Sequence, residues 1–128
     1  MRKLLIAMLS STLLFTSVAA LAQDLSADMD VLKGASRTVQ KTDDKAEMVR
    51  ALTDMRAAAT DAKTQTPDKL QGQAADSEQV KQYHGLLDQL IGRIDASLRL
   101  ANAGDLAGAK EQAKGFDAIR NEGHKQFR

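Results

Sequence analysis

Residues 77–105, SEQVKQYHGLLDQLIGRIDASLRLANAGD, decide the fold class. Their apolar side chains recur every three or four residues, the spacing of one helix face: Val80, Tyr83, Leu87, Leu90, Ile94 and Leu98. Asp76 or Ser77 can cap the start of this helix, and Gly104 stands where a glycine ends one. Asp105 follows at once and can cap another helix. The segment therefore predicts a long amphipathic helix joined to the next by a tight turn.

The sequence on either side predicts three more helices. The first spans about residues 24–41, with Leu25, Met29, Leu32 and Val39 on one stripe. The second begins at Asp43 or Asp44, where DKAE resembles a capping box, and it ends before Pro67. The fourth runs from Leu106 towards Phe127. No segment shows the alternation of apolar and polar residues that is typical of a strand, and residues 65–76 form the one long connection. The sequence therefore predicts an all-α, antiparallel up-down-up-down four-helix bundle.

The first 22 residues have the pattern of a secretory signal peptide. Arg2 and Lys3 precede a short apolar run over residues 4–14, and Ala20-Leu21-Ala22 is a small-x-small cleavage site. The apolar run is short and broken for a membrane span. We therefore expect export to the periplasm, a mature chain that starts at Gln23, and one domain over residues 23–128.

Charge and cysteine content exclude several classes. Without Arg2 and Lys3, the 18 Lys and Arg residues fall to 16, against 17 Asp and Glu, so no basic surplus favours nucleic acid or anionic lipid. The chain has no cysteine, which excludes disulfides, zinc-thiolate sites, iron–sulfur clusters and covalent attachment of c-type haem. We expect a monomer that binds neither nucleic acid nor, once the signal is removed, a membrane.

The predicted topology brings the two ends of the mature chain together. Met29 lies about five residues inside the first helix and His124 about four before the chain end, so each is roughly 6 to 8 Å deep at ~1.5 Å per residue. Tyr83, near the start of the third helix, falls in the same layer. Residues 57–59, three alanines, lie at the matching depth on the second helix. They either leave volume for a bound group or allow close helix packing.

A methionine and a histidine can fill both axial positions of a haem iron, which leaves one-electron transfer as the expected chemistry. Arg120, one turn before His124, could reach a haem propionate. Spacing alone leaves an ordinary structural explanation open for each residue. A histidine in the last turn of a helix often complements the free backbone carbonyls, and a methionine often fills a hydrophobic core. Arg120 can be a solvent-exposed helix residue, and Tyr83 can be an aromatic residue at the end of the core.

Three other residues are weaker ligand candidates on the same geometry. Met48 falls near the opposite end of the bundle, and Met55 falls near its middle. His84 lies at the correct end, but it is one residue off the inward stripe, so we expect it to face solvent.

The pattern as a whole resembles the cytochrome b562 family of exported b-type haem proteins, over essentially the whole mature chain. The residues that carry the resemblance are Asp24-Leu25 with Met29, Leu52-Thr53 with residues 55–59 (MRAAA), Gly92 with Ile94-Asp95, Leu100-Ala101-Asn102, and Arg120-Asn121 with His124 and Arg128. The resemblance implies one non-covalent haem b per chain, with Met29 and His124 as axial ligands. It also implies that Arg120 lies near the haem edge and that Tyr83 contacts the haem.

Two residues depart from the family pattern near this site. Leu87 occupies a position where an aromatic residue is expected, and Gly123 replaces a bulkier residue beside His124. Both predict weaker or more mobile haem binding.

We therefore predict a periplasmic electron-transfer haemoprotein, which is not an enzyme and which exchanges electrons with an unidentified redox protein. The alternative is a haem-free helical binding or adaptor module of the same fold. Hydrolytic catalysis is disfavoured, because no nucleophile–base pair stands out in the sequence.

Overall fold

The computed structural model describes residues 24–128 and contains four long helices. They are α2 (Leu25–Lys41), α3 (Lys45–Lys63), α4 (Glu78–Asn102) and α5 (Leu106–Phe127), with a one-turn 3₁₀ helix η1 (Asp68–Leu70) between α3 and α4. No strand occurs in this described part of the chain. The predicted signal peptide, residues 1–22, and the predicted mature start at Gln23 lie outside it.

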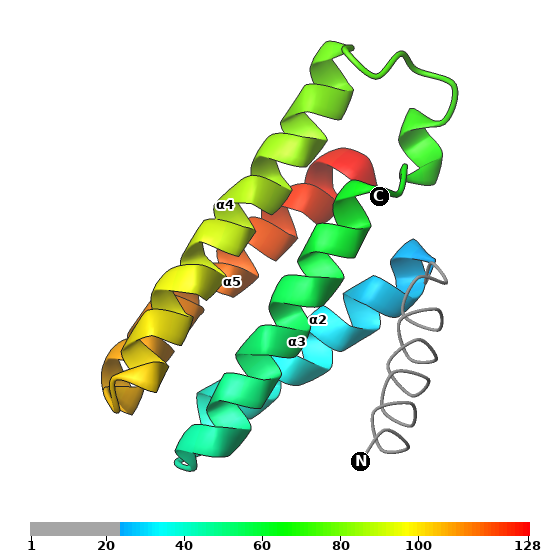
Figure 1. The fold of residues 1–128 in the computed structure, drawn as a ribbon. Helices are drawn as coiled ribbons and strands as arrows, with labels where there is room; N and C mark the ends of the chain where they lie inside the picture. The colour runs from blue at the N-terminus through cyan, green and yellow to red at the C-terminus, as the bar shows by residue number, and fades with distance from the viewer. Residues whose placement is uncertain (1–23) are drawn as a thin grey trace, which may run out of the picture.

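The helices form the antiparallel bundle that the sequence predicts. Consecutive helices pack against each other along the chain, from α2 to α3, from α3 to α4 and from α4 to α5. The start of α2 and the end of α5 lie towards the same end of the bundle, where α3 also ends (Figure 1). Within residues 24–128, no helix is long and apolar enough to span a membrane.

Each helix begins at a side chain that accepts a hydrogen bond from a free backbone N–H of the first turn. The caps are Asp24 to Ala27 N (2.8 Å), Asp44 to Glu47 N (3.1 Å), Ser77 to Val80 N (3.3 Å) and Asp105 to Gly108 N (2.8 Å). At Gly108 the Asp105 carboxylate lies closer than a Cβ would allow, so a side chain there would require that carboxylate to shift. The predicted caps Asp44 and Asp105 are confirmed, and Ser77 rather than Asp76 caps α4.

The turn before α3 differs from the predicted capping box. Thr42, which is buried, donates its hydroxyl to Glu47 and accepts a hydrogen bond from Asp44 N at 3.0 Å. The Glu47 side chain therefore bonds the Thr42 hydroxyl, whereas in a capping box it would accept a hydrogen bond from the backbone N–H of the cap residue, Asp44. Gly104 adopts a φ of +88° after α4, the left-handed conformation that glycine tolerates best, as the sequence predicts.

The core consists of a main cluster along the bundle and a smaller cluster at one end. The main cluster is lined by residues from all four helices, including Leu52, Met55, Ile94 and Phe116. Ala58 and Ala59 are buried within it, whereas Ala57 is exposed, so two of the three alanines serve close helix packing. Ser97 is fully buried and donates its hydroxyl to Ala109 O at 2.9 Å, which ties α4 to α5.

The smaller cluster, called the end cluster here, closes the bundle where the two chain ends meet. Its members are Ala62, Leu70, Val80, Tyr83, Leu87 and Phe127. Leu70 belongs to η1 and is 1% exposed, so the long connection between α3 and α4 folds back as a lid over this end. Leu87, the departure from the family pattern, is buried as an ordinary member of the cluster.

Candidate functional site

Met29 on α2 lies between the main core and the end cluster and packs against both. Its side chain remains partly exposed. Met48 and Met55 differ from it, because they are 0% and 1% exposed inside the main cluster. Met29 is therefore the one methionine of the described chain whose thioether lies at the surface of the core, at the end where α5 finishes.

His124 on α5 is partly exposed and lies one turn before Phe127 of the end cluster. Burial, followed by the positive charges of Arg128 and Arg120, lowers the pKa of its imidazole below the usual value. The ring is therefore neutral at neutral pH, which is the form that binds a metal.

The Arg128 guanidinium lies 3.3 Å from Nδ1 of His124. Because a guanidinium has only donors, this contact requires Nδ1 to accept and places the proton of the neutral ring on Nε2. Coordination through Nε2 therefore requires Arg128 to release the ring and the proton to move to Nδ1.

Arg120 lies one turn before His124 and is partly exposed. Its Nη2 atom is 3.5 Å from Oδ1 of Asp117 on the same helix. An exposed pair of this kind is worth at most about 1 kcal/mol, so it does not prevent the guanidinium from turning to another anion. Arg120 and Arg128 together place two positive charges around His124.

Tyr83 is buried in the end cluster, and its hydroxyl donates to Ala62 O at 2.7 Å. Its ring packs edge-on against Phe127, with 5.6 Å between ring centroids. Burial, followed by the charge of Asp28, raises the pKa of the phenol to about 12. Tyr83 thus connects α3, α4 and α5 at this end and remains protonated.

His84, which the sequence analysis expects to face solvent, is partly exposed. Its ring centroid lies 5.7 Å from that of Tyr83, and the two rings are tilted by 46°. A position one residue off the inward stripe therefore lies at the boundary of the core.

Asp28 is the residue that the sequence analysis missed. Its carboxyl group is 0% exposed. Burial, followed by a hydrogen bond with the Asp61 carboxyl and the charges of Asp61 and Asp24, raises its pKa to about 7. The spacing to Leu32 and Ser36, four and eight residues, was the available signal, since both of these residues are buried on the same face of α2.

The helices that carry Met29 and His124 meet at the loosest seam of the bundle. α2 and α5 contact each other far less than the three consecutive pairs do. We call this junction the α2–α5 seam. A planar group could enter here without separating the extensive contacts of α3 with α2 or α4.

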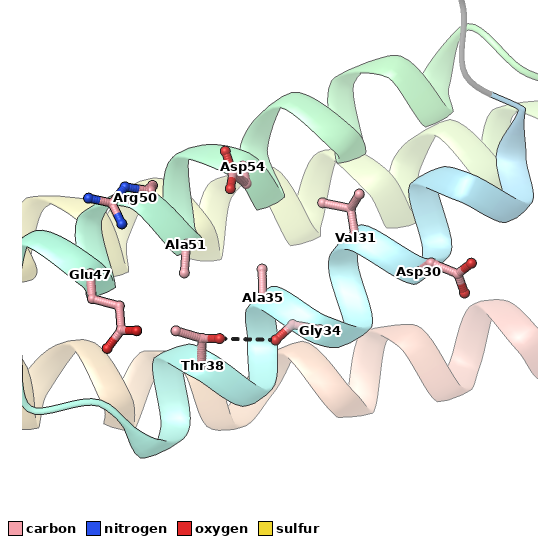
Figure 2. Close-up of a pocket in the computed structure, with 9 residues that line it drawn as sticks. All are labelled: Asp30, Val31, Gly34, Ala35, Thr38, Glu47, Arg50, Ala51 and Asp54. Atoms are coloured by element: carbon pink, nitrogen blue, oxygen red, sulfur yellow. Dashed lines mark hydrogen bonds between the residues drawn. The ribbon is translucent and has the colours of Figure 1, made fainter.

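A groove of the surface lies elsewhere, between α2 and α3. It has a volume of about 380 Å³ and is lined by Asp30, Val31, Gly34, Ala35, Thr38, Glu47, Arg50, Ala51 and Asp54. Figure 2 shows small side chains between the two helices and charged ones along the rim. None of the lining residues is a histidine or methionine, so the groove does not contain the candidate ligands.

The candidate ligands on α2 and α5 are of the kinds that a haem accepts. The described residues contain no cluster of three or more His, Asp or Glu side chains that could hold a metal ion by themselves. A haem needs only two protein ligands, because the porphyrin supplies four nitrogens. A neutral imidazole and a thioether on facing helices, with two arginines nearby for the propionates, match that need.

Gly123 does not interrupt α5, which continues as a regular helix to Phe127. A Cβ at Gly123 would meet only Leu86 Cδ1, at an ordinary contact distance of 3.9 Å. We expect Gly123→Ala to raise stability by about 0.5–1 kcal/mol and to tighten haem binding, because it orders the turn that holds His124.

Gly92→Ala is the matched control for this substitution. Gly92 lies in α4, where an added Cβ meets nothing within 4 Å. It should increase the free energy of unfolding to a similar extent and leave haem affinity unchanged, as measured by urea unfolding and haem titration. Equal gains in haem affinity in both variants would show that the last turn has no special role.

An antiparallel four-helix bundle with an imidazole and a thioether at one end is the architecture of a b-type haem protein. Comparison with known proteins agrees. The family model for cytochrome b562 matches residues 24–128. The chain is 38% identical to "Probable soluble cytochrome b562 2" and 34% identical to "Probable soluble cytochrome b562 1", both from Yersinia pestis and both aligned over the full length of each chain. An uncharacterised protein of Pasteurella multocida is 31% identical over 97% of the chain and 98% of its own length. The chain therefore belongs to the cytochrome b562 family.

Proposed function

We propose that the protein is an electron carrier that binds one non-covalent haem b through Met29 and His124. The proposal is supported by a histidine of lowered pKa near the end of α5 and a partly exposed methionine near the start of α2, two helix ends that lie at the same end of the bundle (Figure 1). When bound, the haem would supply the one-electron iron couple. The chain would supply two ligands and an apolar surface beside the haem. It acts as a carrier and not as an enzyme, because six ligands leave the iron no open position.

The side chains around the seam have separate roles in this proposal. Met29, a soft ligand, favours the ferrous iron and raises the reduction potential. Arg120 binds a propionate once it leaves Asp117. Tyr83 and Phe127 form the apolar surface that excludes water, and Tyr83 stays fixed through its hydrogen bond to Ala62 O.

We also propose that the chain is exported, with residues 1–22 removed, and that it works in the periplasm as a monomer. Its partner is then a redox protein, with neither nucleic acid nor membrane involved. The near-equal counts of acidic and basic residues support this view of the partner, since no surplus charge favours a polyanion.

The test is a potentiometric titration of the haem-loaded protein followed by absorbance. We expect a single one-electron step at one haem per chain. Met29→His should lower the midpoint potential while keeping the haem low-spin, because imidazole stabilises ferric iron relative to thioether. If the chain takes up no stoichiometric haem, the haem-free binding module is supported instead. An unchanged midpoint potential in Met29→His would show that Met29 is not an iron ligand.

Haem binding should respond to pH through His124. Because the pKa of His124 is lowered, the ring stays neutral below its usual value of 6.5, so affinity should stay constant from about pH 8 to pH 6.5. It should fall on further acidification, when the proton competes with the iron. Equilibrium haem titration in an Asp28→Asn background checks this, because that variant removes the buried carboxyl next to Met29, whose pKa is raised to about 7. A fall that begins above pH 7 would contradict it.

A further inference from the structure

The three methionines of the described chain differ in their access to solvent. Met48 and Met55 are 0% and 1% exposed, and both pack inside the main cluster. Met29 is partly exposed and lies in the second turn of α2. We therefore expect an oxidant in solution to reach Met29 in the folded bundle, and to reach the other two only when the bundle opens.

The surroundings of Met29 favour exposure over protection. It lies on α2, whose contact with α5 is slight, and it packs at the junction of the main core and the end cluster instead of inside either. In the haem-free bundle nothing in the described chain covers it fully. Bound at an iron, the same sulfur would be shielded on the side that faces the seam.

We propose that Met29 is a site of oxidation to methionine sulfoxide in the haem-free protein, and that this modification blocks haem uptake. The second half rests on the proposed function, and the first half does not. The oxidant is a peroxide of the hydrogen peroxide class. The thioether sulfur attacks one peroxide oxygen, and an S–O bond forms as the O–O bond breaks. The proton on the transferred oxygen passes to the leaving hydroxide, which departs as water. Sulfur is oxidised by two electrons and the peroxide is reduced by two.

The sulfoxide differs from the thioether in both properties that the site uses. Its sulfur has lost the soft donor character that iron accepts. Its oxygen is polar, and the end cluster beside it offers apolar surface from Tyr83, Leu87 and Phe127. Haem-free protein in which Met29 has been oxidised therefore cannot bind haem until the sulfoxide is reduced. In the haem-bound protein, Met29 is protected from oxidation.

The experiment treats the full chain with hydrogen peroxide, with and without bound haem, and follows each methionine by peptide mass spectrometry. Met48 and Met55 serve as internal controls. In the haem-free chain, Met29 should oxidise at least about tenfold faster than either control, because only the controls require opening of the fold. Similar rates at all three methionines would overturn the proposal.

A second measurement tests the consequence for haem. Oxidised haem-free chain should lose low-spin haem binding in proportion to the Met29 sulfoxide content, and treatment with a methionine sulfoxide reductase should restore it. Haem binding that persists despite complete oxidation at Met29 would overturn the block. Failure of the untreated chain to bind haem would instead refute the proposed function, and the peptide rates would still decide whether Met29 is the oxidation site.

Discussion

Replacing His124 with alanine is expected to convert the bound haem from low-spin to high-spin and to weaken its binding by more than about 100-fold, since even residues that only orient a ligand contribute 10- to 100-fold. His124 is the imidazole on α5 beside the seam, and its lowered pKa keeps the ring available to iron. The absorption spectrum and a haem titration measure both effects.

His84→Ala is the control for that result. His84 lies at the same end of the bundle and is also partly buried, but its ring packs beside Tyr83. Its loss should leave the low-spin spectrum intact. If His84→Ala abolished the low-spin spectrum and His124→Ala did not, the ligand assignment would have to move from α5 to α4.

The second large effect is expected from Asp28→Asn, which keeps the side-chain shape and removes the buried charge. The folded-state pKa of Asp28 is about 7, against an ordinary value of 3.8. Between these values the folded chain binds more protons than the unfolded one, so the stability of the haem-free protein falls as pH rises from about 4 through 7. The variant should lack this loss.

The gain should reach a few kcal/mol at pH 8 and be small near pH 4, since each unit of pKa corresponds to about 1.4 kcal/mol. Urea unfolding of the haem-free protein across this range measures it. Asp30→Asn is the control, because Asp30 is exposed two residues further along α2. Parallel pH profiles for Asp28→Asn and the unmodified chain would show that Asp28 is not the group responsible.

The helices were predictable because their limits depend on local chemistry. Asp44 and Asp105 cap helices by bonding N–H groups three residues away, and Gly104 ends α4 through its own backbone conformation. These interactions involve neighbours in sequence, so spacing alone reveals them. The antiparallel order follows from the two tight turns.

The interior of the site was less predictable, because it depends on the rotation of each helix about its axis. Asp28 lies three residues after Leu25 and four before Leu32, so it shares their face, and in the structure it is fully buried while Met29 is partly exposed. Successive residues are about 100° apart around a helix axis, so the exact rotation of α2 decides which of the two is buried. The contact of His84 with Tyr83 and the hydrogen bond from Tyr83 to Ala62 O are likewise tertiary contacts that no periodicity encodes.

If Met29 and His124 together hold a haem iron, the absorption spectrum of the haem-supplemented protein reports this ligation without any substitution. The sample is recorded oxidised and then reduced with dithionite. Ligation by both residues predicts a sharp Soret band with resolved α and β bands on reduction, the mark of a low-spin, six-coordinate b haem. A high-spin spectrum, or a visible region without bands, would contradict it.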